Sequence, residues 1–285
     1  MIVNADDFGL TAGVNRAIAE LHGEQVVAST SLMARALATA QAVEIARATP
    51  TLGVGCHLVL VDGEPALPPR EIPTLVDGKS GQLRPSLVAF LGRLFTGRIS
   101  IAEIEAEAAS QIALLQSHGV RLTHIDTHKH THMFPAVLRP VLRAARAAGI
   151  RAVRNPFEPV WAISAFVGAS WARIAEVTVL RRLEPICLQI IREEGFVTTD
   201  GTIAVVGTGA LNAATLRSLL ERLPNGTWEL VTHPGYNDAD LAKVSARLRA
   251  SREVEWGALL AIRQFPEIEL ISYADLLREH PEPLL

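Results

Sequence analysis

Short apolar runs alternate along the chain with segments in which apolar residues recur at helical spacing. The pattern is clearest near the N-terminus, where strands are expected at residues 2–5, 26–33 and 52–60, and helices after Thr11 and at residues 36–48. Such alternation is typical of parallel strands covered by crossover helices, in an open sheet or in a barrel. The pattern therefore predicts an α/β fold.

The alternation continues along the rest of the chain with two interruptions. Further helices are expected at residues 87–94, 101–117, 135–148, 211–223, 241–263 and 273–279, and further strands at residues 124–132, 150–154, 195–206 and 228–232. Residues 61–86 are too rich in Pro and Gly for regular structure and are expected to form a flap on the substrate side. Residues 157–194 are expected to be an apolar helical insertion, either core helices or an exposed apolar face. No linker or repeat divides the chain, so residues 1–285 are expected to form one domain.

Composition narrows the class of protein. The chain is 49% hydrophobic and 20% charged, and its formal net charge of −3 gives no basic footprint for nucleic acid. Cys56 and Cys187 are too few for a disulfide framework or a thiolate zinc site. The sequence shows neither a signal-peptide pattern nor an uninterrupted apolar run that could span a membrane, so we expect a cytoplasmic protein. In the helix expected at residues 101–117, we assign the glutamates 103, 105 and 107 to a solvated face.

Residues 124–132 carry an unusual density of histidine. If this run is a β-strand, its even-numbered residues share one face, namely His124, Asp126, His128, His130 and His132. Imidazole is the commonest metal ligand, and a neighbouring carboxylate can fix the tautomer of a ligating histidine. A purification tag is an unsuitable interpretation because the run is internal and interrupted by other residues. We therefore interpret this face as part of a metal-binding site.

Three other expected strands also end in polar residues. Asp6 and Asp7 follow the first strand, while His57 and His233 stand at the ends of later ones. Each alone would be interpreted as a helix cap, a core histidine or a turn residue, but parallel α/β folds bring such strand ends together. One Asp with two His suits Zn²⁺, Mn²⁺, Fe²⁺, Co²⁺ or Ni²⁺ and leaves positions open for water and substrate. A second acid and a separate histidine could then move the protons of a hydrolysis.

The motifs at these strand ends resemble those of the YdjC-like carbohydrate deacetylases, a family that includes a chitooligosaccharide deacetylase and a hopanoid-biosynthesis-associated deacetylase. The matching segments are NADDFGL at residues 4–10, GCHLVL at 55–60, HIDTHKHTHMFP at 124–135 and THPG at 232–235. They occur in order over most of the chain. Residues 57–69, with the EIP segment at 71–73, resemble the hopanoid-associated branch most closely.

The resemblance implies a fold, a reaction and a set of roles. The fold would be a single-domain deformed TIM-like (β/α) barrel, and the reaction would be hydrolysis of the N-acetyl group of a sugar or glycolipid, with release of acetate. One divalent metal ion, Mg²⁺ or Zn²⁺ before Mn²⁺, Co²⁺ or Ni²⁺, would be held by Asp7, His57 and His128. Asp6 would be the general base and His233 the general acid.

Further residues and alternatives remain open. His130, His132, Asp126 and Arg154 would contact the substrate or support the ligands from behind. The four-residue spacing of His128 and His132 also fits one face of a helix, in which case His132 would replace or join His57 as a ligand. The competing functions are another barrel metallohydrolase, such as a phosphoesterase or cyclic amidohydrolase, and a non-catalytic, metal-dependent sugar-binding protein. A homodimer and a peripheral contact with a membrane are also open.

Overall fold

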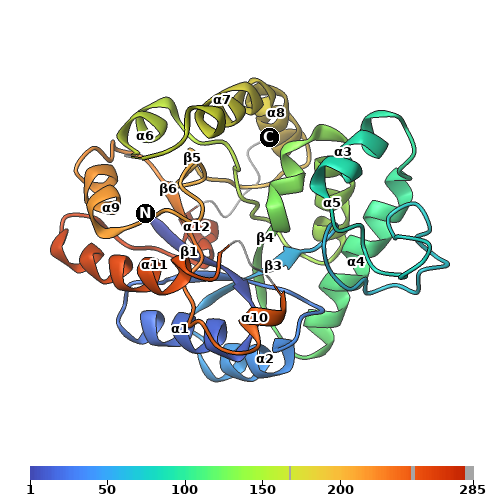
Figure 1. Ribbon diagram of the computed structural model, residues 1–285, viewed down its shortest axis with the longest axis horizontal. Coiled ribbons are helices and arrows are strands. Elements are labelled where there is room, and N and C mark those ends of the chain that lie inside the picture. Colours follow the sequence, from blue (N-terminus) through green and yellow to red (C-terminus); the bar gives the residue numbers. More distant parts are fainter. Residues whose placement is uncertain (167, 245–247, 280–285) are drawn as a thin grey trace.

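The computed structural model describes residues 1–166, 168–244 and 248–279, and its central feature is one curled sheet of parallel strands. Figure 1 shows helices arranged around this sheet. The strand order is β4-β3-β2-β1-β6-β5, with every pairing parallel. The strands are β1 (Ile2–Phe8), β2 (Ser29–Leu32), β3 (Gly53–Leu58), β4 (Leu122–Thr127), β5 (Gly201–Ile203) and β6 (Trp228–Thr232).

Isolated bridges continue the sheet beyond β4. Ile125 pairs in parallel with Val153, and Ala152 pairs in parallel with Val197, so the segments around these residues lie side by side. The chain then runs from Val197 into β5, where the backbone N–H of Thr202 donates to the carbonyl oxygen of Phe157 (3.1 Å). The sheet therefore curves round on itself, which confirms the deformed TIM-like (β/α) barrel predicted from the sequence.

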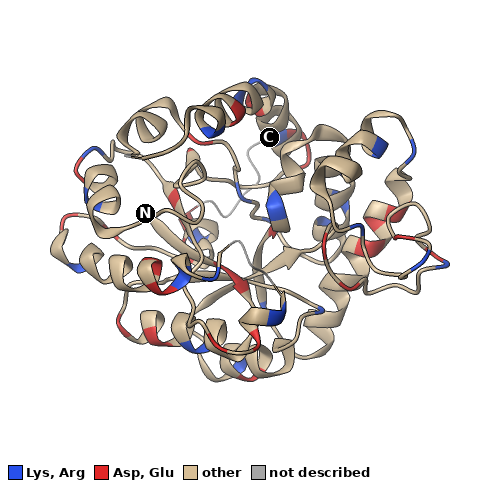
Figure 2. Ribbon diagram, in the orientation of Figure 1, with Lys and Arg blue, Asp and Glu red and all other residues tan. Residues whose placement is uncertain are grey.

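Helices cover the outside of the sheet and form most of the connections between its parallel strands. They are α1 (Ala12–Gly23), α2 (Thr39–Ala48), α3 (Leu87–Phe95), α4 (Ile101–Ser117), α5 (Pro135–Ala147), α6 (Val160–Ala165), α7 (Trp171–Leu180), α8 (Glu184–Glu193), α9 (Ala213–Leu220), α10 (Leu241–Val244), α11 (Ser251–Leu259) and α12 (Tyr273–Glu279). The described residues also include the short 3-10 segments η1 (His128–Met133), η2 (Arg181–Leu183) and η3 (Leu260–Gln264). Thr11 caps α1, because its hydroxyl accepts the N–H of Val14 (3.3 Å). Figure 2 shows charged residues of both signs interspersed over the outer helices.

The strands are buried on both faces of the sheet, which explains why they appear in the sequence as short apolar runs. All residues of β1 and β3 are buried, as expected when helices pack outside the sheet and side chains fill the barrel inside. Asn4 and Asp6 of β1 and Ser31 of β2 are buried polar residues that hydrogen-bond to one another. The barrel interior is therefore polar toward the carboxyl ends of these strands, and this is where the sequence predicted a site.

Residues 61–86 form an ordered loop that packs against the barrel through apolar side chains. The buried ones include Val61, Ile72, Leu75, Val76 and Leu83, and Val76 forms an antiparallel bridge with Leu83. Buried anchors of this kind distinguish a docked loop from a loose surface excursion.

The loop is also held by a glutamate of α4 that the sequence analysis placed wrongly. Glu107 is buried and accepts the backbone N–H groups of Ala66 (2.7 Å) and Leu67 (3.0 Å). Its assignment to a solvated face is wrong, because the loop covers this position and needs an acceptor there. Burial raises the pKa of Glu107, while the N–H groups that it accepts oppose that rise.

The segment at residues 157–194 divides into helices with different environments. Cys187, Ile190 and Ile191 of α8 are buried, whereas Trp171 at the start of α7 is 83% exposed. The segment therefore supplies both core helices and an exposed apolar face, rather than one of the two. Among the described residues, no helix combines the length and the apolar character needed to cross a membrane.

Candidate metal centre

The carboxyl end of β1 carries two buried acids that point to different neighbours. Asp6 and Asp7 are each 2% exposed, and Asp7 has a left-handed backbone with φ of 65°. The pairing register of β1 with β2 also shifts between Ala5 and Phe8. A non-glycine residue in this conformation is strained, and such strain persists where the surrounding structure holds it. The break in regular alternation turns Asp6 toward Arg154 and Asp7 toward two histidines.

Asp7, His57 and His128 converge on one point, although they come from β1, β3 and the start of η1. The Oδ1 atom of Asp7 lies 3.5 Å from Nε2 of His57 and 3.5 Å from Nδ1 of His128, and those two nitrogens are 3.3 Å apart. In the described part of the chain, no hydrogen-bond donor reaches this buried oxygen. A buried carboxylate oxygen left facing two imidazole nitrogens is costly unless a cation joins them. The chemistry of this donor set therefore fits one divalent metal ion.

Asp126 holds His57 from behind. Its Oδ1 lies 2.7 Å from Nδ1 of His57, which leaves Nε2 of that ring directed at Asp7. A proton fixed on Nδ1 gives Nε2 the free lone pair that a metal ligand requires. Burial lowers the pKa of His57, but the charges of Asp126 and the two acids of β1 outweigh this effect and raise it to about 9.

Arg154 is fully buried at the centre of three carboxylates. Its Nη2 atom lies 2.6 Å from Oδ1 of Asp6, 2.7 Å from Oδ2 of Asp126 and 2.7 Å from Oε1 of Glu229. Burial raises the pKa of Asp126, but the Arg154 guanidinium outweighs it and holds that pKa well below its usual range. The ligand atoms of Asp6, His57 and Asp126 also lie close together. Because Arg154 already contacts Asp6 and Asp126, whereas no donor within the described residues reaches Oδ1 of Asp7, the Asp7 group is the better candidate for a metal ion.

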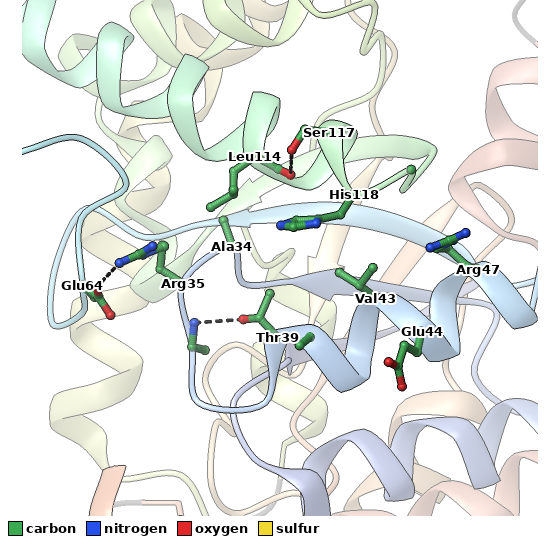
Figure 3. A pocket seen from close by; sticks show the side chains of 13 residues that line it. Ala34, Arg35, Thr39, Val43, Glu44, Arg47, Glu64, Leu114, Ser117 and His118 are labelled. Atoms are coloured by element: carbon green, nitrogen blue, oxygen red, sulfur yellow. Dashed lines mark hydrogen bonds and ion pairs between the residues drawn. The ribbon is translucent and has the colours of Figure 1, made fainter.

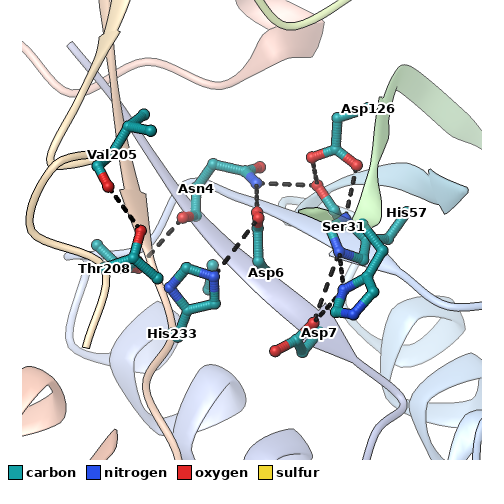
Figure 4. A network of polar contacts seen from close by, with 12 residues as sticks. Asn4, Asp6, Asp7, Ser31, His57, Asp126, Val205, Thr208 and His233 are labelled. Atoms are coloured by element: carbon teal, nitrogen blue, oxygen red, sulfur yellow. Dashed lines mark hydrogen bonds and ion pairs between the residues drawn. The ribbon is translucent and has the colours of Figure 1, made fainter. Parts of the chain in front are cut away.

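Polar residues of β1 and β2 join these carboxylates into one network. The Ser31 hydroxyl donates to Oδ2 of Asp126 (2.6 Å), and the side-chain amide of Asn4 donates to Ser31 (2.9 Å) and to Oδ1 of Asp6 (3.0 Å). Figure 4 shows these contacts running between Asp6 and Asp126. The sequence analysis missed Asn4, Ser31 and Glu229. Their signal was a polar residue at alternate positions of otherwise buried strands.

His233 stands at the end of β6, on the other side of Asp6 from His57 (Figure 4). Its Nε2 atom lies 3.9 Å from Oδ2 of Asp6, and its backbone N–H donates to Glu255 of α11 (2.7 Å). Burial lowers the pKa of His233 to about 4, although the charges of Asp6 and Asp7 oppose this shift. The imidazole is therefore neutral at pH 7 in this environment.

The histidine run leaves the sheet earlier than predicted. β4 ends at Thr127, and the left-handed residues Lys129 (φ 57°) and His130 (φ 51°) turn the chain into η1 and then α5. The prediction that the even-numbered residues through 132 share one strand face is therefore wrong beyond this turn. Nδ1 of His132 lies 2.7 Å from the Thr127 hydroxyl, and neither His130 nor His132 belongs to a metal-competent group within the described residues. The arrangement with His132 as a ligand is not what the fold presents.

An apolar groove begins beside the turn that follows His128. It has a volume of about 490 Å³, and its lining includes His130, Leu91 of α3, Phe157 and Val177 of α7. Glu158 also lines the groove, but its carboxylate accepts the backbone N–H groups of residues 204 and 206 and is buried. The groove is therefore mainly apolar, and its lining includes Lys129 and His130, the two residues that follow His128 in the chain.

A second cavity of about 850 Å³ lies beside α2 and α4 (Figure 3). Its lining residues include Arg35, Arg47 and His118, and Arg35 is paired with Glu64 at the surface. This cavity shares none of its lining residues with the Asp7 cluster or with the apolar groove. We therefore do not connect it with the chemistry of the centre.

Comparison with known proteins agrees with this arrangement. The family model described as YdjC-like protein matches residues 1–264. A carbohydrate deacetylase of Brevibacillus brevis is 31% identical over 285 residues, covering 97% of this chain and 99% of its own. A carbohydrate deacetylase of Geobacillus stearothermophilus is also 31% identical, covering 97% of this chain and 98% of its own.

Solved structures agree as well. An Enterococcus faecalis protein named for a proposed cleavage of cellobiose phosphate has a TM-score of 0.75 and 26% identity, covering 96% of this chain and 97% of its own. A lactam utilization protein of Thermus thermophilus shares the fold alone, with a TM-score of 0.52 and 16% identity. Since the family match spans Asp7, His57, His128 and His233 together with the barrel strands that place them, the chain belongs to the YdjC-like family.

Proposed function

We propose that this protein is a metal-dependent carbohydrate N-deacetylase, which hydrolyses the N-acetyl group of a sugar and releases acetate. The observation that carries the proposal is Oδ1 of Asp7, which has no hydrogen-bond donor among the described residues and faces two imidazole nitrogens at the carboxyl ends of the barrel strands. Both 31% identical relatives carry the name carbohydrate deacetylase, which supports this reaction over other hydrolyses.

Asp7, His57 and His128 would hold the metal ion. Two imidazole nitrogens and one carboxylate oxygen favour Zn²⁺, Co²⁺, Ni²⁺ or Mn²⁺ over Mg²⁺, which prefers oxygen ligands. Such an ion, when bound, polarises the acetyl carbonyl and makes water more acidic. Asp126 would keep His57 in the tautomer that offers Nε2.

Asp6 would take the proton of the attacking water. Arg154 orients its carboxylate through two hydrogen bonds, from Nη1 to Oδ2 (2.9 Å) and from Nη2 to Oδ1 (2.6 Å). His233 would protonate the amine as it leaves. Because its pKa is lowered to about 4, we propose that it receives a proton from Asp6, 3.9 Å away, before it acts as the acid.

The apolar groove points to the kind of sugar that is bound. Its lining includes Lys129 and His130, which directly follow the proposed ligand His128 in the chain, and most of its other lining residues are apolar. An unsubstituted oligosaccharide offers few apolar atoms to such a surface, whereas a sugar with a hydrophobic aglycone would bury that group there. We therefore propose a glycolipid as the substrate, in line with the resemblance to the hopanoid-associated branch.

Acetate release from metal-stripped enzyme tests the proposal. Single metals are added back, and soluble chito-oligosaccharides are compared with an N-acetylglucosamine glycolipid. We expect metal-dependent acetate release that is faster for the glycolipid, and its loss in Asp6→Asn enzyme that still binds metal stoichiometrically. Release of phosphate or opening of a cyclic amide without acetate would instead favour another barrel hydrolase. Metal-dependent sugar binding without any turnover would favour a binding protein.

A further inference from the structure

Arg252 is a buried cation beside the candidate metal centre to which neither the family motifs nor the proposed reaction gives a role. It lies in the first turn of α11 and is 1% exposed. Its Nη2 atom donates to Oδ2 of Asp7 at 2.5 Å, and Nη1 lies 3.5 Å from the carbonyl oxygen of His233. Asp7 is the one carboxylate with which it forms an ion pair among the described residues. A buried guanidinium is expensive to desolvate, so such a placement needs a compensating role.

The two oxygens of Asp7 are divided between two partners. Oδ2 is taken by Arg252, whereas Oδ1 faces His57 and His128 and has no donor in the described part of the chain. A free carboxylate can bind a metal ion through one oxygen or through both. With Oδ2 held by a charge-assisted hydrogen bond, only Oδ1 is free to bind.

The loop after β6 is shaped around this contact. A Cβ atom built at Gly235 would lie 3.0 Å from Cδ of Arg252 and 2.9 Å from a methyl group of Val14. Both distances are shorter than ordinary carbon contacts, so a side chain at this position would push the arginine away from Asp7. Gly235 therefore leaves the space through which the Arg252 side chain reaches Asp7.

We propose that Arg252 is a positioning residue that keeps Asp7 a ligand through one oxygen, and thereby leaves coordination positions free for water and for the acetyl carbonyl. The inference rests on the proposed metal centre at Asp7, His57 and His128. It concerns the geometry of that centre and not the identity of the substrate.

Cobalt-loaded protein provides a direct test, because the intensity of Co²⁺ visible absorption falls as its coordination number rises. We expect Arg252→Met at saturating Co²⁺ to absorb less than wild type, since Asp7 can then bind through both oxygens. Its kcat should fall about tenfold or more while KM stays within about twofold, because the change would weaken stabilisation of the transition state and leave substrate binding intact. Arg252→Lys, which retains a cationic donor, should restore the wild-type spectrum. The control is Arg263→Met, which removes an exposed arginine that pairs with Glu24.

A wild-type spectrum in Arg252→Met would overturn the inference. If that variant does not fold, Gly235→Ala decides, because its methyl group would displace the arginine without removing it. Gly235→Ala should weaken the Co²⁺ absorption, and an unchanged spectrum would again refute the role of Arg252. Failure of wild-type protein to bind stoichiometric Co²⁺ would overturn the metal centre itself, which keeps the two failures distinguishable.

Discussion

Replacement of Arg154 by Met probes the polar interior that supports the site. The substitution keeps an apolar stem of similar length but leaves Asp6, Asp126 and Glu229 without the cation that lies 2.6–2.7 Å from each of them. Removing one partner of a buried ion pair typically costs about 3–5 kcal/mol. The three contacts share one charge and are not additive, so we expect a loss of about 4 kcal/mol in the free energy of unfolding at pH 7. That loss corresponds to a fall in Tm of roughly 8–16 °C.

The loss should depend on pH with a definite sign. In wild type, the pKa of Asp126 is held well below its value in the unfolded chain. Its contribution to stability is therefore present above about pH 4 and is lost as the pH falls toward the folded pKa. In Arg154→Met, burial without the cation would raise the pKa values of these carboxyls above their unfolded values. The variant should therefore gain stability as the pH falls from 7 to 5, and the gap to wild type should narrow.

Thermal unfolding followed by circular dichroism at pH 7 and pH 5 measures both effects. The control is Arg143→Met, which removes a half-exposed pair with Glu105 on the outer helices and should cost about 1 kcal/mol or less at either pH. If Arg154→Met lost no more than this control, or if its gap to wild type widened at pH 5, the cluster would not be the ion-paired core that its distances indicate.

Four further changes test other parts of the structure. Asp126→Asn should lower metal affinity about 10–100-fold in a titration monitored by calorimetry, because His57 loses the partner that fixes its tautomer. Since the pKa of His57 is about 9 and metal binds only the deprotonated ring, metal affinity should rise about tenfold per pH unit between pH 6 and 8; a flat profile would contradict this. Leu91→Arg should reduce kcat/KM for a glycolipid about tenfold and leave soluble chito-oligosaccharides unaffected; equal losses would remove the groove from substrate binding. Glu107→Ala should lower stability by about 1–3 kcal/mol in urea unfolding and speed proteolysis within residues 61–86, while unchanged cleavage would show that the loop does not need this anchor.

The α/β alternation and the strand ends that carry the candidate site could be predicted because both depend on local patterns, whereas the barrel came from the family resemblance. Apolar runs marked the strands, helical spacing marked the helices, and polar residues at strand ends marked Asp7, His57 and His128. Parallel strands place their carboxyl ends together, so convergence followed without knowledge of the strand order. The family membership was also evident from four short motifs.

The positions of individual side chains within the site required the structure. The left-handed backbone at Asp7 and the turn at Lys129 and His130 depend on how the chain leaves the sheet, and alternation along a strand carries no information on where it stops. Glu107 has the helical position of a solvated residue and is buried only because a loop 40 residues away in sequence covers it. Tertiary packing decided each of these cases.

The burial of arginines is the feature of the site that the sequence indicates least. Arg252 stands among 27 lysines and arginines, and local sequence does not distinguish it from those that stay in water, whereas Arg154 was expected at the site only through the family resemblance. Their burial becomes intelligible only with the acids they meet, because a guanidinium leaves water where carboxylates compensate its desolvation. Arg154 contacts three carboxylates, and Arg252 holds one oxygen of Asp7, so the other oxygen of Asp7 is the one at which we propose the metal ion. Each arginine holds carboxylate oxygens that could otherwise bind a metal ion, so the proposed chemistry depends on both arginines as well as on the proposed ligands.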